Sequence, residues 1–433
     1  MNQVGVGIVG FGTVGAGVAE GLLLNRQTLS KRLGVDVALR KIADLDISTS
    51  RGFPVPSDLL TTNADELIAD PSIQILVETV GGTTFAKDLI LKALAAGKSV
   101  VTANKKLLAE QGREIFAAAR EHGRDIYFGA SVGGGIPIIR CLREGLVGNR
   151  IESICGILNG TCNYILTRMI REGAAFGDVL KDAQALGFAE ADPTLDVDGW
   201  DTAHKACILA ALAYDLAVSP REIEVHGIRD LSRVDVAYAH ELGHTIKLLA
   251  HIARHGSEVE VAVSPTLVPN DHALSAVNGV FNAVMVRGDF SDELLFSGKG
   301  AGRRPTASTV IGDIADLARN LATGARARYT SAVPSLDEEL ALAKGSTSRF
   351  YARLMVADRC GALGQFGTIF GAHGVSIKCA SSHEFLKGQE RAGSIPVVVR
   401  THEARACDMS AALDEIERAG IVCEKPVAMR MIG

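Results

Sequence analysis

Apolar runs and helical spacing alternate regularly over the first third of the chain. Residues 4–9 form an apolar run that predicts a buried strand, and residues 13–24 carry small and apolar side chains at helical spacing. The elements that follow are predicted as strands at 73–78 and 98–102 and as helices at 86–96 and 106–122. Strands that alternate with helices of this length are typical of a parallel, doubly wound α/β sheet.

The pattern changes after about residue 133. A strand is predicted at 151–158, helical spacing then dominates to residue 213, and it returns at 234–253 and 306–321. This mixture predicts a second domain of the α+β class. We expect the 306–321 helix to pack back on the first domain.

The end of the chain has a pattern of its own. Residues 324–348, with Pro334, Gly345 and several serines, are typical of a linker. The elements after it are predicted as strand 350–356, helix 363–372, strand 375–379, strand 394–400, helix 409–419 and strand 422–430. The predicted domains are therefore 1–132, 133–323 and a βαββαβ module at 349–433.

Composition narrows the class of protein. The net charge is −5, from 45 Lys and Arg against 50 Asp and Glu, so no general basic field exists to hold a nucleic acid. The eight cysteines are scattered without a C-x-x-C pair, which favours reduced thiols over disulfides or zinc. The longest apolar run, 206–214, is far below the about 18 residues of a membrane span, and the start lacks a basic signal region. We expect a cytoplasmic protein with neither a nucleic-acid nor a membrane partner.

The strongest motif follows the first predicted strand. It reads Gly10, Phe11, Gly12, Thr13, Val14, Gly15, which is G-x-G-x-x-G between a strand and a helix. The first glycine permits a tight turn, the second lets the backbone approach a pyrophosphate, and the third allows close helix packing. The helix start adds N–H donors and the positive end of its dipole. In this α/β context the motif predicts NAD or NADP binding, whereas alone it could be a turn in an unrelated fold.

The choice between NAD and NADP stays open at this point. Asp44 stands at the predicted end of the second strand, where a carboxylate can accept hydrogen bonds from a ribose. Arg40 and Lys41 are close in sequence and could instead bind a 2′-phosphate.

Lys105 lies just beyond another strand of the same sheet. It follows Thr102 at the carboxyl edge, where ligands bind in parallel sheets. An ammonium group there can polarise a carbonyl or hold a carboxylate. Two solvated lysines at a helix start are the alternative, which the helix dipole disfavours.

The segment from Glu190 to Lys205 has the most distinctive chemistry. Carboxylates precede a helix predicted from about residue 200 to 214, and Asp201 and Lys205 fall at i and i+4 on one helical face. Because the helix is almost wholly apolar beyond Lys205, this lysine should be partly desolvated and suited to proton transfer. An ordinary ion pair on a helix surface is the alternative.

His240, Glu241 and His244 match the zinc-protease pattern H-E-x-x-H on a predicted helix. The longer metzincin pattern fails, because Lys247 and Ala250 stand where a glycine and a third histidine belong. We therefore favour chance occurrence over a zinc site.

Taken together, the chain resembles the homoserine dehydrogenases over essentially its whole length. The matching stretches are 10–15, 102–105, 133–138, 156–164, 190–205, 298–302 and 305–308. The resemblance implies a Rossmann domain, a catalytic and dimerisation domain, and a C-terminal ACT regulatory domain. It also implies reduction of L-aspartate 4-semialdehyde to L-homoserine by NAD(P)H in threonine and methionine biosynthesis, by a homodimer or homotetramer with L-threonine as an ACT effector.

The resemblance also assigns roles to residues. Lys205 resembles the acid/base lysine, Asp201 its orienting carboxylate and Lys105 a second catalytic lysine. The substrate set that it implies is Glu190, Lys105, Asp196, Asp201, Gly160 and Thr161. The cofactor set is Gly10, Phe11, Gly12, Thr13, Val14, Gly15, Arg40, Asp44, Gly81, Thr102, Lys105, Gly300 and Gly302. A monovalent cation such as Na+ would bind the backbone carbonyls of Val132, Gly134 and Ile136.

Several positions depart from the family's usual pattern, including Cys360 where proline is usual and Ser382 and His383 where glutamine is frequent, which weaken the case for threonine feedback but not for the ACT module itself. Three others concern the cation, the cofactor and the substrate. Gly129 stands where the family often has glutamate near the cation, which leaves the cation site in doubt. Leu45 stands where an arginine is frequent, which weakens the case for NADP. Phe188 replaces a common tyrosine, so any hydroxyl contact with the substrate is lost.

Two other functions remain as alternatives. One is another Rossmann dehydrogenase acting on a small carbonyl compound, and the other is a non-catalytic Rossmann/ACT protein that senses amino acids. The intact Lys205 favours an enzyme, because a sensor has no use for an acid/base group.

Overall fold

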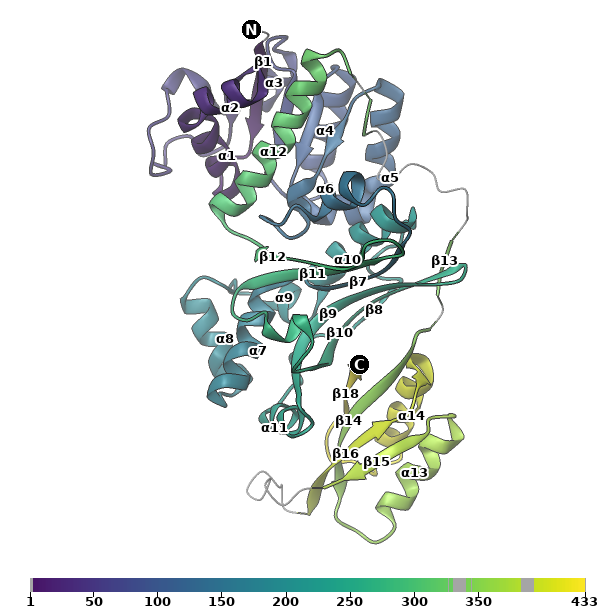
Figure 1. The fold of residues 1–433 in the computed structure, drawn as a ribbon. Helices are drawn as coiled ribbons and strands as arrows, with labels where there is room; N and C mark the ends of the chain where they lie inside the picture. The colour runs from purple at the N-terminus through teal and green to yellow at the C-terminus, as the bar shows by residue number, and fades with distance from the viewer. Residues whose placement is uncertain (1–2, 326, 330–339, 344, 383–392, 433) are drawn as a thin grey trace. The chain divides into compact units, whose positions relative to one another are not determined.

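The computed structural model describes residues 3–325, 327–329, 340–343, 345–382 and 393–432 (Figure 1). They form two compact units. Unit 1 consists of Met1–Ile154, Ala203–Ile223 and Phe281–Leu340, and unit 2 consists of Cys155–Thr202, Glu224–Val280 and Ala341–Gly433. The chain therefore passes between the units several times.

Unit 1 contains a six-stranded sheet in the order β3-β2-β1-β4-β5-β6, with every pair parallel. The strands are β1 (Gln3–Val9), β2 (Asp36–Ala43), β3 (Leu60–Thr61), β4 (Ile75–Glu78), β5 (Ser99–Thr102) and β6 (Ile126–Tyr127). This order reverses at β1 and places a ligand-binding crevice at the carboxyl ends of the strands. The prediction of a doubly wound parallel sheet is confirmed.

Helices α1 (Thr13–Leu24) and α12 (Arg303–Ala322) pack side by side on this sheet (Figure 1). Val6 and Ile8 of β1, Leu22 of α1, and Val310 and Ile314 of α12 belong to one buried cluster. A helix from late in the sequence thus completes the core around the first strand.

The other helices of unit 1 follow the predicted strand–helix alternation. They include α3 (Ala64–Ala69), α4 (Phe85–Ala95) and α5 (Lys105–His122), and the long first crossover contains α2 (Arg26–Leu33). The Asn104 side chain accepts a hydrogen bond from Leu107 N and so caps the start of α5. Gly123, in the left-handed conformation, ends the helix.

The sequence pattern missed a hairpin in unit 1. Strands β11 (Phe281–Gly288) and β12 (Asp292–Lys299) pair in antiparallel register directly before α12. The β12 side chains alternate between exposed and partly buried positions, so its apolar content is too low to stand out in the sequence.

Unit 2 contains a long antiparallel pair, β9 (His244–His255) and β10 (Glu258–Pro269). The prediction of one helix over 234–253 is wrong. Helix α11 covers only Arg233–Glu241, and Gly243, with φ of 71°, turns the chain into β9. The apolar run of β9 suits either a buried strand or a helix, which explains the error.

Four helices surround the candidate residues of the middle region. They are α7 (Gly160–Glu172), α8 (Phe176–Ala185), α9 (Thr194–Val197) and α10 (Trp200–Tyr214), the last of which continues from unit 2 into unit 1. Strand β7 (Ile151–Ile157) leads into α7. Among the described residues, no helix has the length and apolar character needed to cross a membrane.

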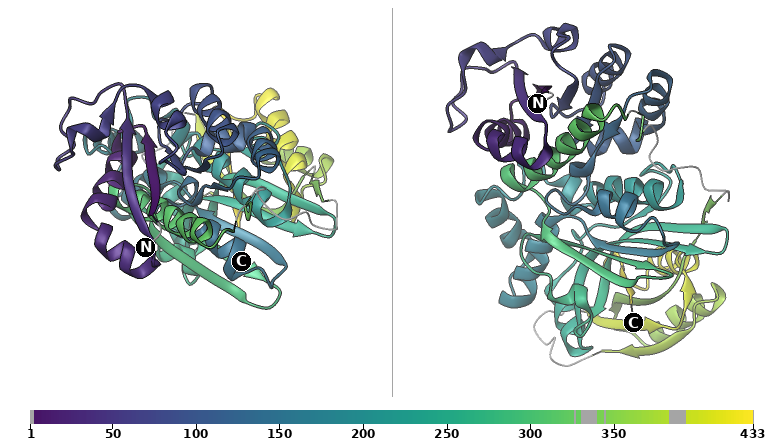
Figure 2. Two further views of the ribbon diagram at one scale, coloured as in Figure 1. Left: turned by 90° about the horizontal axis from the view of Figure 1, so that it is seen from above. Right: turned by 45° about the horizontal axis from the view of Figure 1, so that its top comes forward.

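The C-terminal part of unit 2 has the predicted βαββαβ order (Figure 1), and Figure 2 shows the same part, in light green to yellow, from two further sides. Its elements are β14 (Thr347–Ala357), α13 (Ala362–Ala372), β15 (Ile377–Ser381), β16 (Ser394–Thr401), α14 (Ala406–Arg418) and β18 (Val427–Met431). The short strand β17 (Ala404–Arg405) pairs with β14. Phe366, Phe370, Met409 and Ile416 pack in one core beneath these strands.

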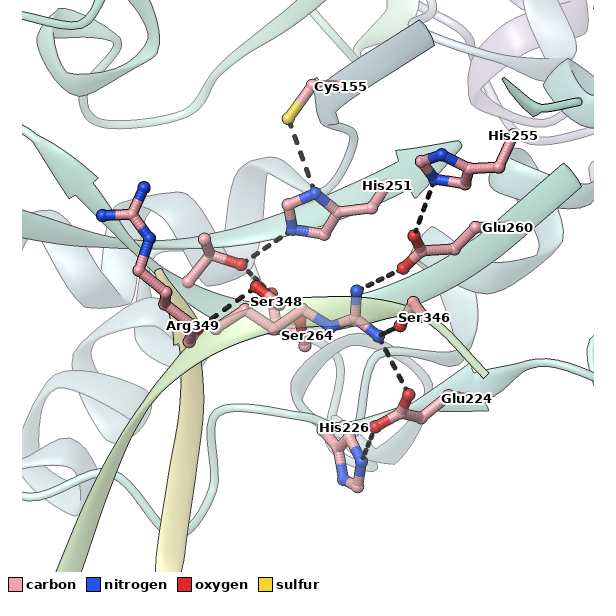
Figure 3. A network of polar contacts seen from close by, with 12 residues as sticks. Cys155, Glu224, His226, His251, His255, Glu260, Ser264, Ser346, Ser348 and Arg349 are labelled. Carbon is pink, nitrogen blue, oxygen red and sulfur yellow. Dashed lines mark hydrogen bonds and ion pairs between the residues drawn. The ribbon is translucent and has the colours of Figure 1, made fainter. Parts of the chain in front are cut away.

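A buried polar network joins β18 to the middle strands of unit 2 (Figure 3). Strand β18 pairs in parallel with β10, and the Arg430 guanidinium contacts Glu260, Ser346 and Glu224, the last at 3.0 Å. Nearby, the imidazole of His251 lies 2.9 Å from Thr266 Oγ1. Burial lowers the pKa of His251 to about 3, so its ring is neutral at physiological pH.

Candidate active site

The glycine-rich turn between β1 and α1 has the shape that a dinucleotide requires. Gly10 has φ of 97°, and a Cβ there would lie 2.6 Å from the backbone carbon of Thr79. A Cβ on Gly15 would collide with the Gly10 carbonyl, whereas the space in front of Gly12 is open. No side chain caps α1, so its first N–H groups can bind a pyrophosphate. These residues fit the predicted cofactor.

Asp44 lies beside this turn. Its carboxylate accepts hydrogen bonds from Phe11 N and, at 2.9 Å, from Asp46 N. The Arg51 guanidinium lies 5.3 Å from the centre of the Phe11 ring and donates to the Asp46 carbonyl at 2.8 Å. Arg51 could not be predicted to lie here, because it reaches the turn only through the folded loop after β2.

Arg40 and Lys41 are not brought to the turn. The Arg40 guanidinium donates to the side chain of Gln3, at the opposite end of β1, and Lys41 Nζ lies 3.1 Å from Glu66. The register between β1 and β2 shifts at Arg40, between the pairs Val6–Leu39 and Gly7–Lys41.

The loops after β4 and β5 meet at the carboxyl edge of the same sheet. Thr102 Oγ1 donates to Glu78 at 2.6 Å, and Asn104 Nδ2 donates to the Gly82 carbonyl at 2.7 Å. Gly81, with φ of 80°, lies in the first loop, and Lys105 is the first residue of α5 after the second. The predicted cofactor residues Gly81, Thr102 and Lys105 thus belong to two loops that are hydrogen-bonded to each other.

Helix α10 carries the predicted acid/base pair. Asp201 and Lys205 are one turn apart, and their exposed fractions are only 6% and 8%. The neighbouring His204 Nε2 lies 3.5 Å from Glu110 Oε1, which links α10 to α5 within unit 1. Burial of both Asp201 and Lys205 argues against an ordinary surface ion pair, which would be solvated.

Asn159 connects the predicted substrate carboxylates in unit 2. Its Nδ2 donates to Asp196 at 2.7 Å and to Asp201 at 2.9 Å, and its Oδ1 accepts from Cys162 N at the start of α7. This buried residue was only one letter of a motif in the sequence. Its role could not be predicted because both partners are far away along the chain.

The remaining substrate residues lie on the segments around α7 and α8. Gly160 begins α7, and Thr161 Oγ1 donates to the Phe188 carbonyl at 2.6 Å. Phe188 stacks edge-on with Tyr164, with 5.1 Å between ring centres. The Glu190 side chain is exposed, and its backbone carbonyl accepts from Gln184 Nε2 at 3.1 Å.

Several families of dehydrogenase could have a site of this kind, and comparison with known proteins shows which family this chain belongs to. The family model described as "Homoserine dehydrogenase, NAD binding domain" matches residues 10–129, and the model described as "Homoserine dehydrogenase" matches residues 137–315. The chain belongs to the homoserine dehydrogenase family. It is an NAD(P)-dependent oxidoreductase whose substrates are L-aspartate 4-semialdehyde and L-homoserine.

Individual homoserine dehydrogenases agree over the full length. The Synechocystis sp. protein is 41% identical over 443 residues, covering 99% of both chains, and the Bacillus subtilis protein is 38% identical over 433 residues, covering 100% of this chain and 99% of its own. The crystal structure from Thiobacillus denitrificans matches with a TM-score of 0.90 at 38% identity, over 100% of this chain and 99% of that one. Family membership sets aside both the amino-acid sensor and the other dehydrogenases.

Asp313 lies beside Gly129, near the candidate cation site of this homoserine dehydrogenase. A Cβ on Gly129 would lie 2.9 Å from both carboxylate oxygens of Asp313, and Gly129 N donates to that carboxylate at 2.8 Å. Asp313 of α12 therefore fills the space beside Gly129. Burial raises the pKa of Asp313 to about 7.

Two of the three predicted cation ligands already accept hydrogen bonds. The Gly134 carbonyl accepts from Thr309 Oγ1 at 2.7 Å, and the Ile136 carbonyl accepts from Ile138 N at 2.8 Å. Each carbonyl keeps a second lone pair for a cation. The same turn packs against Gly300, and Gly302, with φ of 121°, follows before α12 begins.

The zinc-protease pattern has no structural counterpart in this dehydrogenase. His240 and Glu241 end α11, whereas His244 begins β9, so the prediction that both histidines share a helix face is wrong. The His244 ring nitrogen Nδ1 lies 2.6 Å from the Leu242 carbonyl. The described part of the chain contains no cluster of three or more His, Cys, Asp or Glu side chains suited to a metal ion.

Proposed function

We propose that Lys205 is the acid/base group of the reaction and that Lys105 is the second catalytic lysine. The observation that carries this proposal is the burial of Lys205 one helical turn after the buried Asp201. A desolvated ammonium beside a carboxylate is suited to exchange a proton with substrate. Lys105 stands at the carboxyl edge of the cofactor-binding sheet, where a second positive charge can act on the same oxygen.

The chemistry explains why lysines are needed. NAD(P)H, when bound, supplies the hydride that converts the aldehyde carbon to an alcohol. Negative charge then develops on the carbonyl oxygen, where Lys205 donates a proton and Lys105 stabilises the charge. Glu190, Asp196 and Asp201 are the proposed partners of the substrate's ammonium group, and Asn159 holds Asp196 and Asp201 in place.

We propose NAD as the preferred cofactor. The Asp44 carboxylate lies at the end of β2 against the glycine-rich turn, where it can accept from the 2′-hydroxyl of NAD and would repel the 2′-phosphate of NADP. Arg40 and Lys41 are engaged elsewhere, and Leu45 offers no charge. NADP is the alternative cofactor, because the structure of a hyperthermophilic archaeal homoserine dehydrogenase was determined in complex with NADPH; it is 31% identical, covers 73% of this chain and matches with a TM-score of 0.61.

The finer features of the assembly are also proposals. We assign 349–433 as an ACT regulatory domain on the basis of its βαββαβ order. The resemblance to the family implies L-threonine as its effector and a homodimer or homotetramer as the assembly. The archaeal homoserine dehydrogenase has no counterpart for about a quarter of this chain, which fits an added module. A monovalent cation such as Na+ at Val132, Gly134 and Ile136 remains compatible with their free lone pairs. We also propose that the chain divides into domains at 1–132, 133–323 and 349–433, joined by a linker at 324–348. Residues 326, 330–339 and 344 of this linker lie outside the described residues.

Replacing Lys205 tests the central role. We expect Lys205→Ala to lower kcat for homoserine oxidation by about 10²-fold or more, since general acid–base groups contribute on this scale. Lys181→Ala, at an exposed position on α8, is the matched control and should keep wild-type kcat. Turnover of Lys205→Ala close to that of the wild type would refute the assignment.

A further inference from the structure

Glu78 is a buried carboxylate at the edge of the cofactor-binding sheet, and the reaction as described gives it no role. It is the last residue of β4, and its exposed fraction is 0%. Burying a carboxylate is costly unless hydrogen bonds compensate for the lost water. The hydrogen-bond partners of Glu78 therefore indicate which part of the structure this carboxylate stabilises.

Each oxygen of Glu78 binds a different loop. Oε1 accepts from Val80 N at 2.9 Å and from Gly81 N at 3.0 Å, in the loop after β4. Oε2 accepts from Thr102 Oγ1 at 2.6 Å, at the end of β5. The carboxylate thus holds together the two loops that carry the predicted cofactor residues.

The network continues to the start of α5. Thr102 Oγ1 accepts from Asn104 N at 3.0 Å, and Asn104 Nδ2 donates back to the Gly82 carbonyl at 2.7 Å. Asn104 Oδ1 also caps α5, whose first residue is Lys105. A shift of the Glu78 carboxylate would therefore move the Gly81 loop and the Lys105 backbone together.

We propose that Glu78 is a positioning residue that fixes Lys105 and the Gly81 loop relative to the bound cofactor. The proposal rests on the proposed roles of Gly81, Thr102 and Lys105. A carboxylate suits this task because both of its oxygens accept, so it can bind donors on two sides at once. Glutamine keeps one acceptor oxygen for the Gly81 loop, but its NH2 group would then face Thr102 Oγ1 and would have to donate to it, so the hydrogen bond from Thr102 to a charged acceptor is lost.

Calorimetric titration of the full-length protein with NADH and with NADPH tests this idea without relying on turnover. We expect Glu78→Gln to raise the cofactor Kd about tenfold or more, as the loss of a hydrogen bond to a charged group would. Thr102→Val should also raise Kd, and the double variant should bind within about twofold of the weaker single variant, because both changes break one network. In steady-state assays, kcat of Glu78→Gln should fall as well.

Asp316→Asn is the matched control. Asp316 is a buried carboxylate of unit 1 that accepts from Tyr127 OH at 2.7 Å, so its loss should lower Tm but leave cofactor Kd unchanged. Wild-type Kd and kcat in Glu78→Gln, or Kd effects that multiply in the double variant, would overturn the proposal. If Glu78→Gln fails to fold, a wild-type Kd in Thr102→Val overturns it. Because Lys205→Ala leaves this network intact, failure of the acid/base assignment is distinguishable from failure here.

Discussion

At the scale of single residues, Asp313 and Gly129 form a buried pair that links α12 to the end of the parallel sheet. Gly129 has no side chain, and the Asp313 carboxylate occupies the space beside it. Arg143, Arg140 and Asp316 also face this carboxylate, yet burial prevails and holds the pKa of Asp313 near 7. A pKa this far above the ordinary value of 3.8 makes the site sensitive to pH.

The stability of the protein should reflect this pKa. In the unfolded chain Asp313 ionises near pH 4, whereas in the folded state it keeps its proton up to about pH 7. The folded state therefore binds the extra proton, and stability from this group is lost as the pH rises from 4 to 7. We expect the free energy of unfolding of Asp313→Asn, relative to that of the wild type, to be about 2 kcal/mol higher at pH 8 than at pH 5. Urea unfolding at the two pH values measures this difference. Asp88→Asn, at an exposed site on α4, should show no such change, and an equal effect of Asp313→Asn at both pH values would contradict the pKa.

At the scale of elements, the position at which α11 ends decides whether the H-E-x-x-H residues can form a zinc site. Helix α11 stops at Glu241 because Gly243 adopts a left-handed conformation, and this separates His240 from His244. A zinc site of the H-E-x-x-H type needs both histidines on one helix face. The motif is therefore a coincidence of sequence.

Metal analysis checks this conclusion. We expect the purified protein to contain no stoichiometric zinc, and a zinc chelator should leave Tm unchanged because His240 and His244 belong to different elements. His240→Ala and His226→Ala should behave alike, since His226 pairs with Glu224 outside the motif. One zinc per chain that disappears in His240→Ala alone would restore the metal hypothesis.

The same scale shows what the sequence could predict. The sequence pattern predicts β1, β4, β5, α1, α4 and α5 to within two residues, because their apolar runs are short and sharply bounded. The short strands β3 and β6 and the helix α3 were not predicted. The sequence of β9 predicts a helix, since an apolar run that is buried along its middle fits both a helix and a strand, and only its pairing with β10 decides. Spacing placed Asp201 and Lys205 on one helix face, whereas Asn159 binds partners 37 and 42 residues away. Such contacts depend on the fold and leave no local signal.

At the scale of the whole molecule, homoserine dehydrogenases from bacteria match the chain from end to end, whereas the archaeal one matches about three quarters of it. About a quarter of this chain therefore has no counterpart in that archaeal structure. Strand β18, near the end of the chain, pairs with β10 and anchors Arg430 between Glu224 and Glu260. Through these contacts the C-terminal module is joined to the middle strands of unit 2.

The most direct test of the account is an absorbance assay for reduced nicotinamide with the purified protein. L-homoserine should drive formation of reduced cofactor, with a higher kcat/KM for NAD than for NADP because of Asp44. L-serine, which lacks one methylene group, should support far slower turnover and serves as the control. Absence of homoserine-dependent reduction with both cofactors would contradict the account.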